Sequence, residues 1–252
     1  MSATIYLVGA GPGSADFLTV RAARLLGQAD VVLYDALVCK DVLELAPHAR
    51  KVLVGKRAGH VSTDQAFINR LLVRSARDGQ IVVRLKGGDP MIFGRAHEEI
   101  EACQRAGLEV EIVPGITAAS AAAAHLQTSL TQRGIARSIS FVTPSAERGS
   151  SANTAWADVV ATSQTSAMYM AASQSAFVRG TLLARGMAAQ LPVVLVSNAG
   201  RPEAEHRAGC LDDLCDLSTN LSEGPTILLI GDVFAHLNFD LKNEDTWRRQ
   251  IL

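Results

Sequence analysis

The chain has 252 residues, of which 48% are apolar and 19% charged, and this balance excludes an intrinsically disordered protein, which needs low hydrophobicity and high charge. Its 24 Lys and Arg residues are balanced by 25 Asp and Glu residues, so the net charge is -1 and no basic surface for nucleic acid is predicted. The length accommodates one large domain or two small ones, and glycine-rich turns in two separate places favour two.

Cysteine usage and the N-terminus predict a cytoplasmic protein. Cys39, Cys103, Cys210 and Cys215 include no C-x-x-C pair and lack the density of a secreted disulfide framework, so we interpret them as reduced thiols. The N-terminus shows no signal-peptide pattern, and no run of 18 apolar residues is present. We therefore expect no membrane association.

The first part of the chain alternates between short apolar runs and helical patterns. Because the strand-like runs are almost continuously apolar, they predict a mostly parallel sheet covered by helices on both faces. Residues 1–115 are therefore predicted to form an N-terminal α/β domain. The strands are expected at 5–8, 31–34, 51–54, 81–85 and 110–113, and the helices at about 19–26, 65–76 and 98–106.

The second part begins with an alanine-rich helix at 118–126 and predicts another α/β domain, residues 116–240, followed by a polar tail at 241–252. A Ser/Thr-rich stretch at 145–166 has few apolar side chains, so we expect a partly mobile surface segment there. The strands of this domain are expected at 138–142, 167–170, 193–196 and 226–230.

A glycine turn at 9–13 follows the first strand and brings main chain close to another group, either a ligand or a neighbouring turn. A dinucleotide fingerprint would use Asp35 for the ribose. However, it needs a third glycine where Ser14 stands, and Pro12 lacks the N–H that a pyrophosphate requires. A NAD-linked dehydrogenase is thus a weaker alternative.

A second glycine turn, Gly87-Gly88, follows the strand at 81–85. Open α/β sheets bind ligands at the carboxyl ends of their strands, and adjacent glycines expose peptide groups that suit a compact polar ligand. Neither turn matches the Walker pattern, so ATP hydrolysis is not supported. The sequence also lacks a spaced metal-ligand cluster and a G-x-S-x-G elbow, so neither a metal nor a serine hydrolase is predicted.

Six motifs follow one another along the chain at Val8–Gly13, Tyr34–Val38, Val54–Arg57, Arg84–Glu99, Val113–Ala118 and Leu130–Arg133. They closely resemble the uroporphyrinogen-III C-methyltransferases of the tetrapyrrole methylase family, and the likeness covers roughly residues 4–238. The resemblance implies a two-domain α/β fold with a mostly parallel N-terminal sheet, a mixed C-terminal sheet and the active site in the cleft between them. It also implies a homodimer that transfers methyl groups from S-adenosyl-L-methionine (SAM) to C2 and C7 of uroporphyrinogen III, giving precorrin-2 and S-adenosyl-L-homocysteine.

The resemblance assigns chemistry to five residues. It implies that Asp35 accepts a proton, that Lys56 donates one, and that Glu98 accepts a pyrrole N–H or helps remove a proton. Arg95 and Arg133 are implied to bind substrate carboxylates, for which a guanidinium fork is suited. A surface ion pair for Asp35 and Lys56, and a helix N-terminal carboxylate for Glu98, are the alternatives.

Cofactor contacts are implied at nine positions. Asp89 would bind the polar groups of SAM, and Met170 would pack near its adenosine or sulfonium unless it is a core methionine. Ala199 stands where the family has glycine, which requires a negative φ there. The implied set is Pro12, Gly87, Gly88, Asp89, Ile92, Thr117, Ala118, Met170 and Ala199.

Several positions depart from the family pattern. Gln132 replaces a histidine, Ala96-His97 replaces two glycines, Pro144-Ser145 replaces Gly-His, and Ala171 replaces another glycine. Main-chain contacts to a cofactor tolerate such changes better than substrate geometry does. A methylase of a later corrin intermediate, and a non-catalytic module that keeps the cofactor site, therefore remain alternatives.

Overall fold

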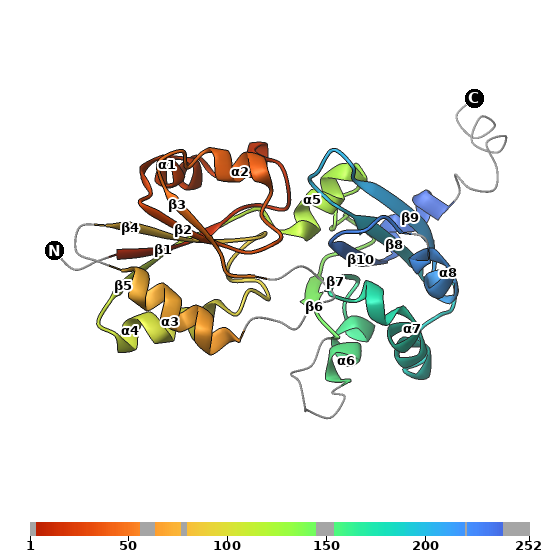
Figure 1. Ribbon diagram of the computed structural model, residues 1–252. Helices are drawn as coiled ribbons and strands as arrows, with labels where there is room; N and C mark the ends of the chain where they lie inside the picture. The colour runs from red at the N-terminus through yellow and green to blue at the C-terminus, as the bar shows by residue number, and fades with distance from the viewer. Residues whose placement is uncertain (1–3, 56–63, 77–79, 145–153, 220, 239–252) are drawn as a thin grey trace. The chain divides into compact units, whose positions relative to one another are not determined.

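A computed structural model describes residues 4–55, 64–76, 80–144, 154–219 and 221–238 (Figure 1). The chain divides into two compact units. The first comprises residues 1–118 with 200–202, and the second comprises 119–199 with 203–252. The short segment 200–202, which follows most of the second unit in sequence, thus packs with the first.

The first unit contains a five-stranded sheet in the order β3-β2-β4-β1-β5, and every pairing in it is parallel. The predicted parallel sheet is confirmed. Central β4 is buried along nearly its whole length, as its apolar run requires. The strands are β1 (Thr4–Gly9), β2 (Val31–Tyr34), β3 (Arg50–Leu53), β4 (Ile81–Lys86) and β5 (Glu109–Val113).

Helices cover both faces of this sheet (Figure 1). α1 (Val20–Gln28) and α2 (Lys40–Glu44) pack on one face, and α3 (Gln65–Ser75) and α4 (Ala96–Arg105) pack on the other. The hydroxyl of Thr19 accepts a hydrogen bond from the first turn of α1 and starts that helix. Apolar side chains of α1 and α3 fill the two cores, among them Ala22, Leu25, Leu26, Ile68 and Leu72.

The second unit contains a mixed sheet in the order β6-β7-β10-β8-β9, as the resemblance implied. β6 and β7 are parallel, and the other pairings are antiparallel. α6, α7 and α8 contribute to the core on one face. The elements are α5 (Ala118–His125), β6 (Ile139–Val142), α6 (Ala155–Thr162), β7 (Thr165–Tyr169), α7 (Ser175–Ala184), β8 (Pro192–Ser197), β9 (Glu205–Cys210), α8 (Leu214–Ser218) and β10 (Thr226–Gly231).

The structure corrects the prediction for the Ser/Thr-rich stretch 145–166. α6 lies within it and buries Trp156, Ala157 and Val160, which share one helical face. The spacing of these three residues stabilises a helix although the stretch that contains them is rich in Ser and Thr. Residues 145–153 lie outside the described ranges. None of the helices in the described ranges is long and apolar enough to cross a membrane.

Candidate functional site

The ends of three parallel strands meet at a glycine cluster in the first unit. A Cβ added to Gly115 would lie 2.2 Å from the carbonyl oxygen of Gly88 and 2.8 Å from Cα of Gly9, so no side chain fits there. Gly88 has φ +68, and nothing lies within 4 Å of where its Cβ would stand. The strand ends are thus locked together by main chain, and open space remains beside Gly88.

The first glycine loop is occupied by contacts within the unit. Gly11 and Gly88 exchange hydrogen bonds, with N···O distances of 3.2 and 2.7 Å, and Ser14 donates to the carbonyl of Gly200 at 2.9 Å. The ring of Pro12 packs against Gly200. A 3-10 turn, Ala15–Phe17, follows, and α1 begins only at residue 20. These amides are therefore unavailable to a pyrophosphate, which argues against the dinucleotide alternative.

Asp89 stabilises the second glycine loop. Its Oδ1 accepts from the N–H of Met91 at 2.8 Å, and its Oδ2 accepts from the N–H of Gly115 at 2.9 Å. The turn that follows holds Phe93 and Arg95 at positive φ, 51° and 53°. Two non-glycine residues in this conformation mark a constrained segment, as functional turns often are.

The other predicted cofactor residues lie in both units. Ile92, Thr117 and Ala118 are half-buried in the first unit. Met170 and Ala199 belong to the second, where Met170 is exposed with φ 56. Met170 is therefore not a core methionine. Ala199 is buried and does not have a positive φ, which meets the condition placed on that position.

Asp35 follows β2 at the same sheet edge and forms an ion pair with Arg84 of β4. Arg84 Nη2 lies 2.6 Å from Asp35 Oδ1. The predicted partner, Lys56, lies outside the described residues. The side chain of Asp35 is 26% exposed, whereas that of Arg84 is 2% exposed. The carboxylate of Asp35 is therefore accessible, and the buried guanidinium of Arg84 binds one of its oxygens.

A buried ionic cluster extends inward from Arg84. Its Nε donates to Oε1 of Glu99 at 3.0 Å, and Nζ of Lys86 donates to both oxygens of Glu99 at 3.1 and 3.0 Å. Burial, and then the neighbouring Arg84, lower the pKa of Lys86. No role was predicted for these three residues from the sequence. The available signal was the presence of two cations in the otherwise apolar run of β4.

Arg95 and Glu98, which were predicted to contact the substrate, form a bidentate ion pair with each other at the start of α4. Nε and Nη2 of Arg95 donate to the two oxygens of Glu98 at 2.7 and 2.8 Å. The hydrogen bond from Arg95 lowers the pKa of Glu98, so this carboxylate is a weaker base than a free glutamate. Both side chains are largely exposed and accessible to a ligand.

Arg133 lines a hollow of about 390 Å³ in the second unit, together with Thr131, Gln132, Ala136 and Arg137. Gln132 and Ala136 exchange main-chain hydrogen bonds of 2.9 and 2.8 Å, which fold the loop back on itself. Two arginines thus line one hollow, and arginine side chains suit the binding of carboxylates. A substrate contact was predicted for Arg133 but not for Arg137.

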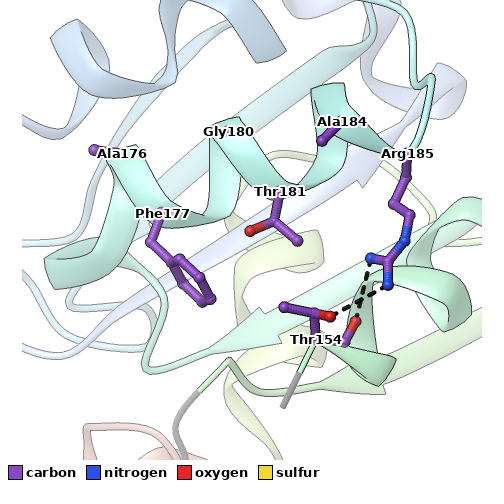
Figure 2. Close-up of a pocket in the computed structure, with 7 residues that line it drawn as sticks. All are labelled: Thr154, Ala176, Phe177, Gly180, Thr181, Ala184 and Arg185. Atoms are coloured by element: carbon purple, nitrogen blue, oxygen red, sulfur yellow. Dashed lines mark hydrogen bonds between the residues drawn. The ribbon is translucent and has the colours of Figure 1, made fainter. Parts of the chain in front are cut away.

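Another hollow in the second unit, of about 540 Å³, contains no predicted site residue (Figure 2). Phe177 and Gly180 of α7 line it, and Arg185 donates to Oγ1 of Thr154 at 3.2 Å across one end. Arg185 also pairs with Asp158 of α6. These contacts attach α6 to α7, which is a structural role. Among the described residues, no group of three or more metal-ligating side chains is present.

Comparisons with known proteins place this geometry in a family. The family described as Tetrapyrrole (Corrin/Porphyrin) Methylases matches residues 4–215. A uroporphyrinogen-III C-methyltransferase of Pseudomonas aeruginosa is 45% identical over 234 residues, covering 92% of this chain and 95% of that protein. A siroheme synthase of Baumannia cicadellinicola is 44% identical over 230 residues, covering 91% of this chain and 50% of that protein. The chain thus spans about half the length of the siroheme synthases it matches.

Solved structures agree. Uroporphyrin-III C-methyl transferase from Thermus thermophilus, complexed with S-adenyl homocysteine, has a TM-score of 0.81 and 37% identity, covering 92% of this chain and 99% of that one. Cobalt precorrin-4 methyltransferase has a TM-score of 0.80 and 29% identity, covering 91% and 95%. The chain therefore belongs to the tetrapyrrole (corrin/porphyrin) methylase family.

Proposed function

We propose that the protein is a SAM-dependent C-methyltransferase that converts uroporphyrinogen III to precorrin-2 by methylation at C2 and C7. The observation that carries this proposal is the 45% identity to the Pseudomonas aeruginosa uroporphyrinogen-III C-methyltransferase over nearly the full length of both chains. The product would enter sirohaem, cobalamin or haem d1 biosynthesis.

The sheet edge of the first unit fits SAM. The space beside Gly88 admits a ligand close to main chain, and the turn held by Asp89 keeps the Gly87-Gly88 peptide groups in place. We propose that Pro12, Ile92, Thr117 and Ala118 complete the contacts in this unit. When bound, SAM supplies an electrophilic methyl group on a positively charged sulfur. For Met170 and Ala199, which lie in the other unit, the proposal rests on the resemblance of the sequence.

The chemistry requires positioning and proton removal. The pyrrole carbons of a porphyrinogen are electron-rich, so alignment with the methyl donor supplies much of the rate enhancement. Methylation at carbon must be followed by loss of a proton from that carbon, and we propose Asp35 as its acceptor. Following the resemblance, we propose Lys56 as a proton donor. The accessible carboxylate of Asp35 suits this role.

The substrate carries several carboxylates, and we propose that Arg133 and Arg95 bind them. Arg133 lines the hollow described above, and its guanidinium has no ion-pair partner among the described residues. Arg95 would exchange its pairing with Glu98 for a substrate carboxylate, which would release Glu98 to accept a pyrrole N–H.

The experiment is anaerobic incubation with enzymatically generated uroporphyrinogen III and SAM, followed by mass analysis of the oxidised product. We expect a gain of two methyl groups. SAM binding in calorimetry without methylation of this substrate would refute the proposal. Methylation of a later corrin intermediate instead would favour the alternative function, a methylase of such an intermediate. The similarity to cobalt precorrin-4 methyltransferase is the reason to test it.

Two variants test substrate anchoring. Arg133→Ala should lower turnover by about 10-fold or more, since a charge-assisted hydrogen bond is worth roughly 1.5–3 kcal/mol, and should leave SAM affinity nearly unchanged. Arg24→Ala, which removes an exposed arginine from α1, is the matched control and should behave like the unchanged protein. Equal turnover in both variants would remove the role assigned to Arg133.

We also propose a cytoplasmic homodimer. The resemblance supports a dimer, and the exposed apolar residues Ile139 and Phe141 on edge strand β6 offer a surface that contact with a partner would cover. Light scattering at micromolar concentration tests the oligomeric state. A mass of 26.7 kDa, which is that of the single chain, would contradict the dimer.

A further inference from the structure

The buried charges of the first unit form a chain of contacts with Arg84 at its centre. This guanidinium reaches Asp35 through Nη2 at 2.6 Å and Glu99 through Nε at 3.0 Å. Its Nη1 donates to the carbonyl of Leu85 at 3.1 Å. Three directions of the guanidinium plane are thus fixed by separate acceptors, so the group has one orientation.

Glu99 holds the far side of Arg84 and is itself held. Its Oε1 accepts from Arg84, from Lys86 at 3.1 Å and from Nε2 of Gln65 at 3.3 Å, and its Oε2 accepts from Lys86 at 3.0 Å. Asp35 and Glu99 together balance the charges of Arg84 and Lys86. The cluster is therefore neutral as a whole, which is the condition under which buried charges are tolerated.

Exposure differs sharply along this chain of contacts. Arg84, Lys86 and Glu99 are at most 4% exposed, whereas Asp35 is 26% exposed. The end at Asp35 also lies near the glycine loop, because the N–H of Asp35 donates to the carbonyl of Leu85, two residues before Gly87, at 3.3 Å. Of the four charged groups, Asp35 alone can therefore meet a ligand. Its bond to Arg84 uses Oδ1 and leaves Oδ2 without a hydrogen-bond partner among the described residues.

We propose that Arg84 is a positioning residue, which orients the carboxylate of Asp35 for proton acceptance, and that Glu99, backed by Lys86, fixes Arg84 in turn. The inference rests on the proposed function, in which Asp35 accepts the proton. A base must lie within hydrogen-bond reach of the proton that it removes, and a displacement of about 1 Å can lower a rate by about 100-fold. Because the guanidinium of Arg84 is bound to Glu99 on one side and to Asp35 on the other, it prevents such a displacement of the Asp35 carboxylate.

A double-mutant cycle on turnover tests the proposal, using D35A, R84M and the double variant at saturating SAM. R84M leaves Lys86 and Glu99 as a neutral buried pair, and the charge that loses its partner is that of Asp35, whose side chain is 26% exposed. We expect R84M to lower kcat by about 10-fold or more, since misplaced general bases lose factors of about 10² to 10⁴, with SAM affinity within twofold by calorimetry. In the D35A background, R84M should cause no further loss, because a residue that acts through Asp35 has nothing left to position.

Controls separate positioning from structure. Arg50→Met makes the same substitution at an exposed residue of β3 and should leave kcat unchanged. R84K keeps the charge but not the fork, so it should not restore turnover. If R84M fails to fold, the charge-balanced pair K86M/E99Q carries the same test, because it removes the groups that fix Arg84 while keeping the bond to Asp35.

Three outcomes would overturn the proposal. R84M with normal kcat would show that Arg84 positions nothing. A loss that multiplies with that of D35A would show that Arg84 acts independently. A D35A variant with normal turnover would refute the proton-acceptor role and the inference with it, although methylation by the unchanged protein would still support the proposed function.

Discussion

Neutralising Glu99 should destabilise the first unit far more than neutralising its neighbour on the same helix. The carboxylate is fully buried and bound to two cations, Arg84 and Lys86. Glu99→Gln leaves these cations with Asp35 as the remaining anion of the cluster. Breaking a buried ion pair from one side costs about 3–5 kcal/mol, and the amide oxygen of Gln still accepts one hydrogen bond, so we expect about 3 kcal/mol.

Glu101→Gln is the matched control, because Glu101 makes the same kind of contact at the surface of α4. It pairs with Arg105 one turn along at 2.5 Å, and its side chain is 51% exposed. Such a pair is worth about 0.3–0.5 kcal/mol. Urea unfolding followed by circular dichroism measures both variants, and unchanged m-values would confirm that the midpoint shifts report stability. In a thermal scan the buried variant should melt on the order of 10 °C lower.

Charge balance makes the prediction sharper. Lys86→Met in the Glu99→Gln background removes the excess cation, so the double variant should be more stable than Glu99→Gln alone, because neutral buried substitutions are tolerated better than an unpaired charge. Free energies of unfolding for Glu99→Gln and Glu101→Gln within about 1 kcal/mol of each other would refute the reasoning, since the buried penalty must exceed that margin.

Three further predictions concern packing and protonation. Gly115→Ala should destabilise the protein by about 3 kcal/mol, because the added Cβ would lie 2.2 Å from a main-chain oxygen. Gly27→Ala in α1 should instead stabilise the protein by about 0.5–1 kcal/mol. Denaturant midpoints measure both changes. Burial raises the pKa of Cys103 from its ordinary 9.0 to about 11, so the folded state holds the proton more tightly. The free energy of unfolding should therefore fall as pH rises from about 9 to 11, and Cys103→Ala should flatten that slope; an unchanged slope would contradict this assignment. Arg95→Ala should raise the pKa of Glu98 in a carboxyl-carbon NMR titration, and an unmoved titration would show that the ion pair does not form in solution.

β1, β2 and β4 were predictable because burial on both faces makes them almost continuously apolar. β9 was not predicted, since Glu205–Cys210 is half-exposed and mixes polar residues with glycine. α6 was hidden because its short apolar run lies within a Ser/Thr-rich stretch. Strands that are buried on both faces are therefore easier to predict from their apolar runs than an element that is half-exposed or flanked by polar sequence.

The site shows the same limit. The sequence predicted Asp35 at the end of a strand and paired it with Lys56, which lies outside the described residues, but it did not indicate Arg84 as a partner. In the structure β4 lies beside β2, with Leu33 opposite Arg84, and that neighbour supplies the cation. Strand order decides this pairing, and strand order is not contained in the periodicity of any one segment. Motif resemblance pointed to Gly87 and Gly88 because these two residues are adjacent in sequence, and their contact with a cofactor stays a prediction.

The buried cluster also bears on how the first unit folds. Glu99 follows Lys86 by 13 residues and Arg84 by 15, whereas Asp35 precedes Arg84 by 49. A short separation makes loop closure cheaper, so Glu99 can pair early with the cations of β4. The strand that enters the middle of the sheet thus has half of its countercharge on the helix that follows it, and Asp35 supplies the other half when β2 docks.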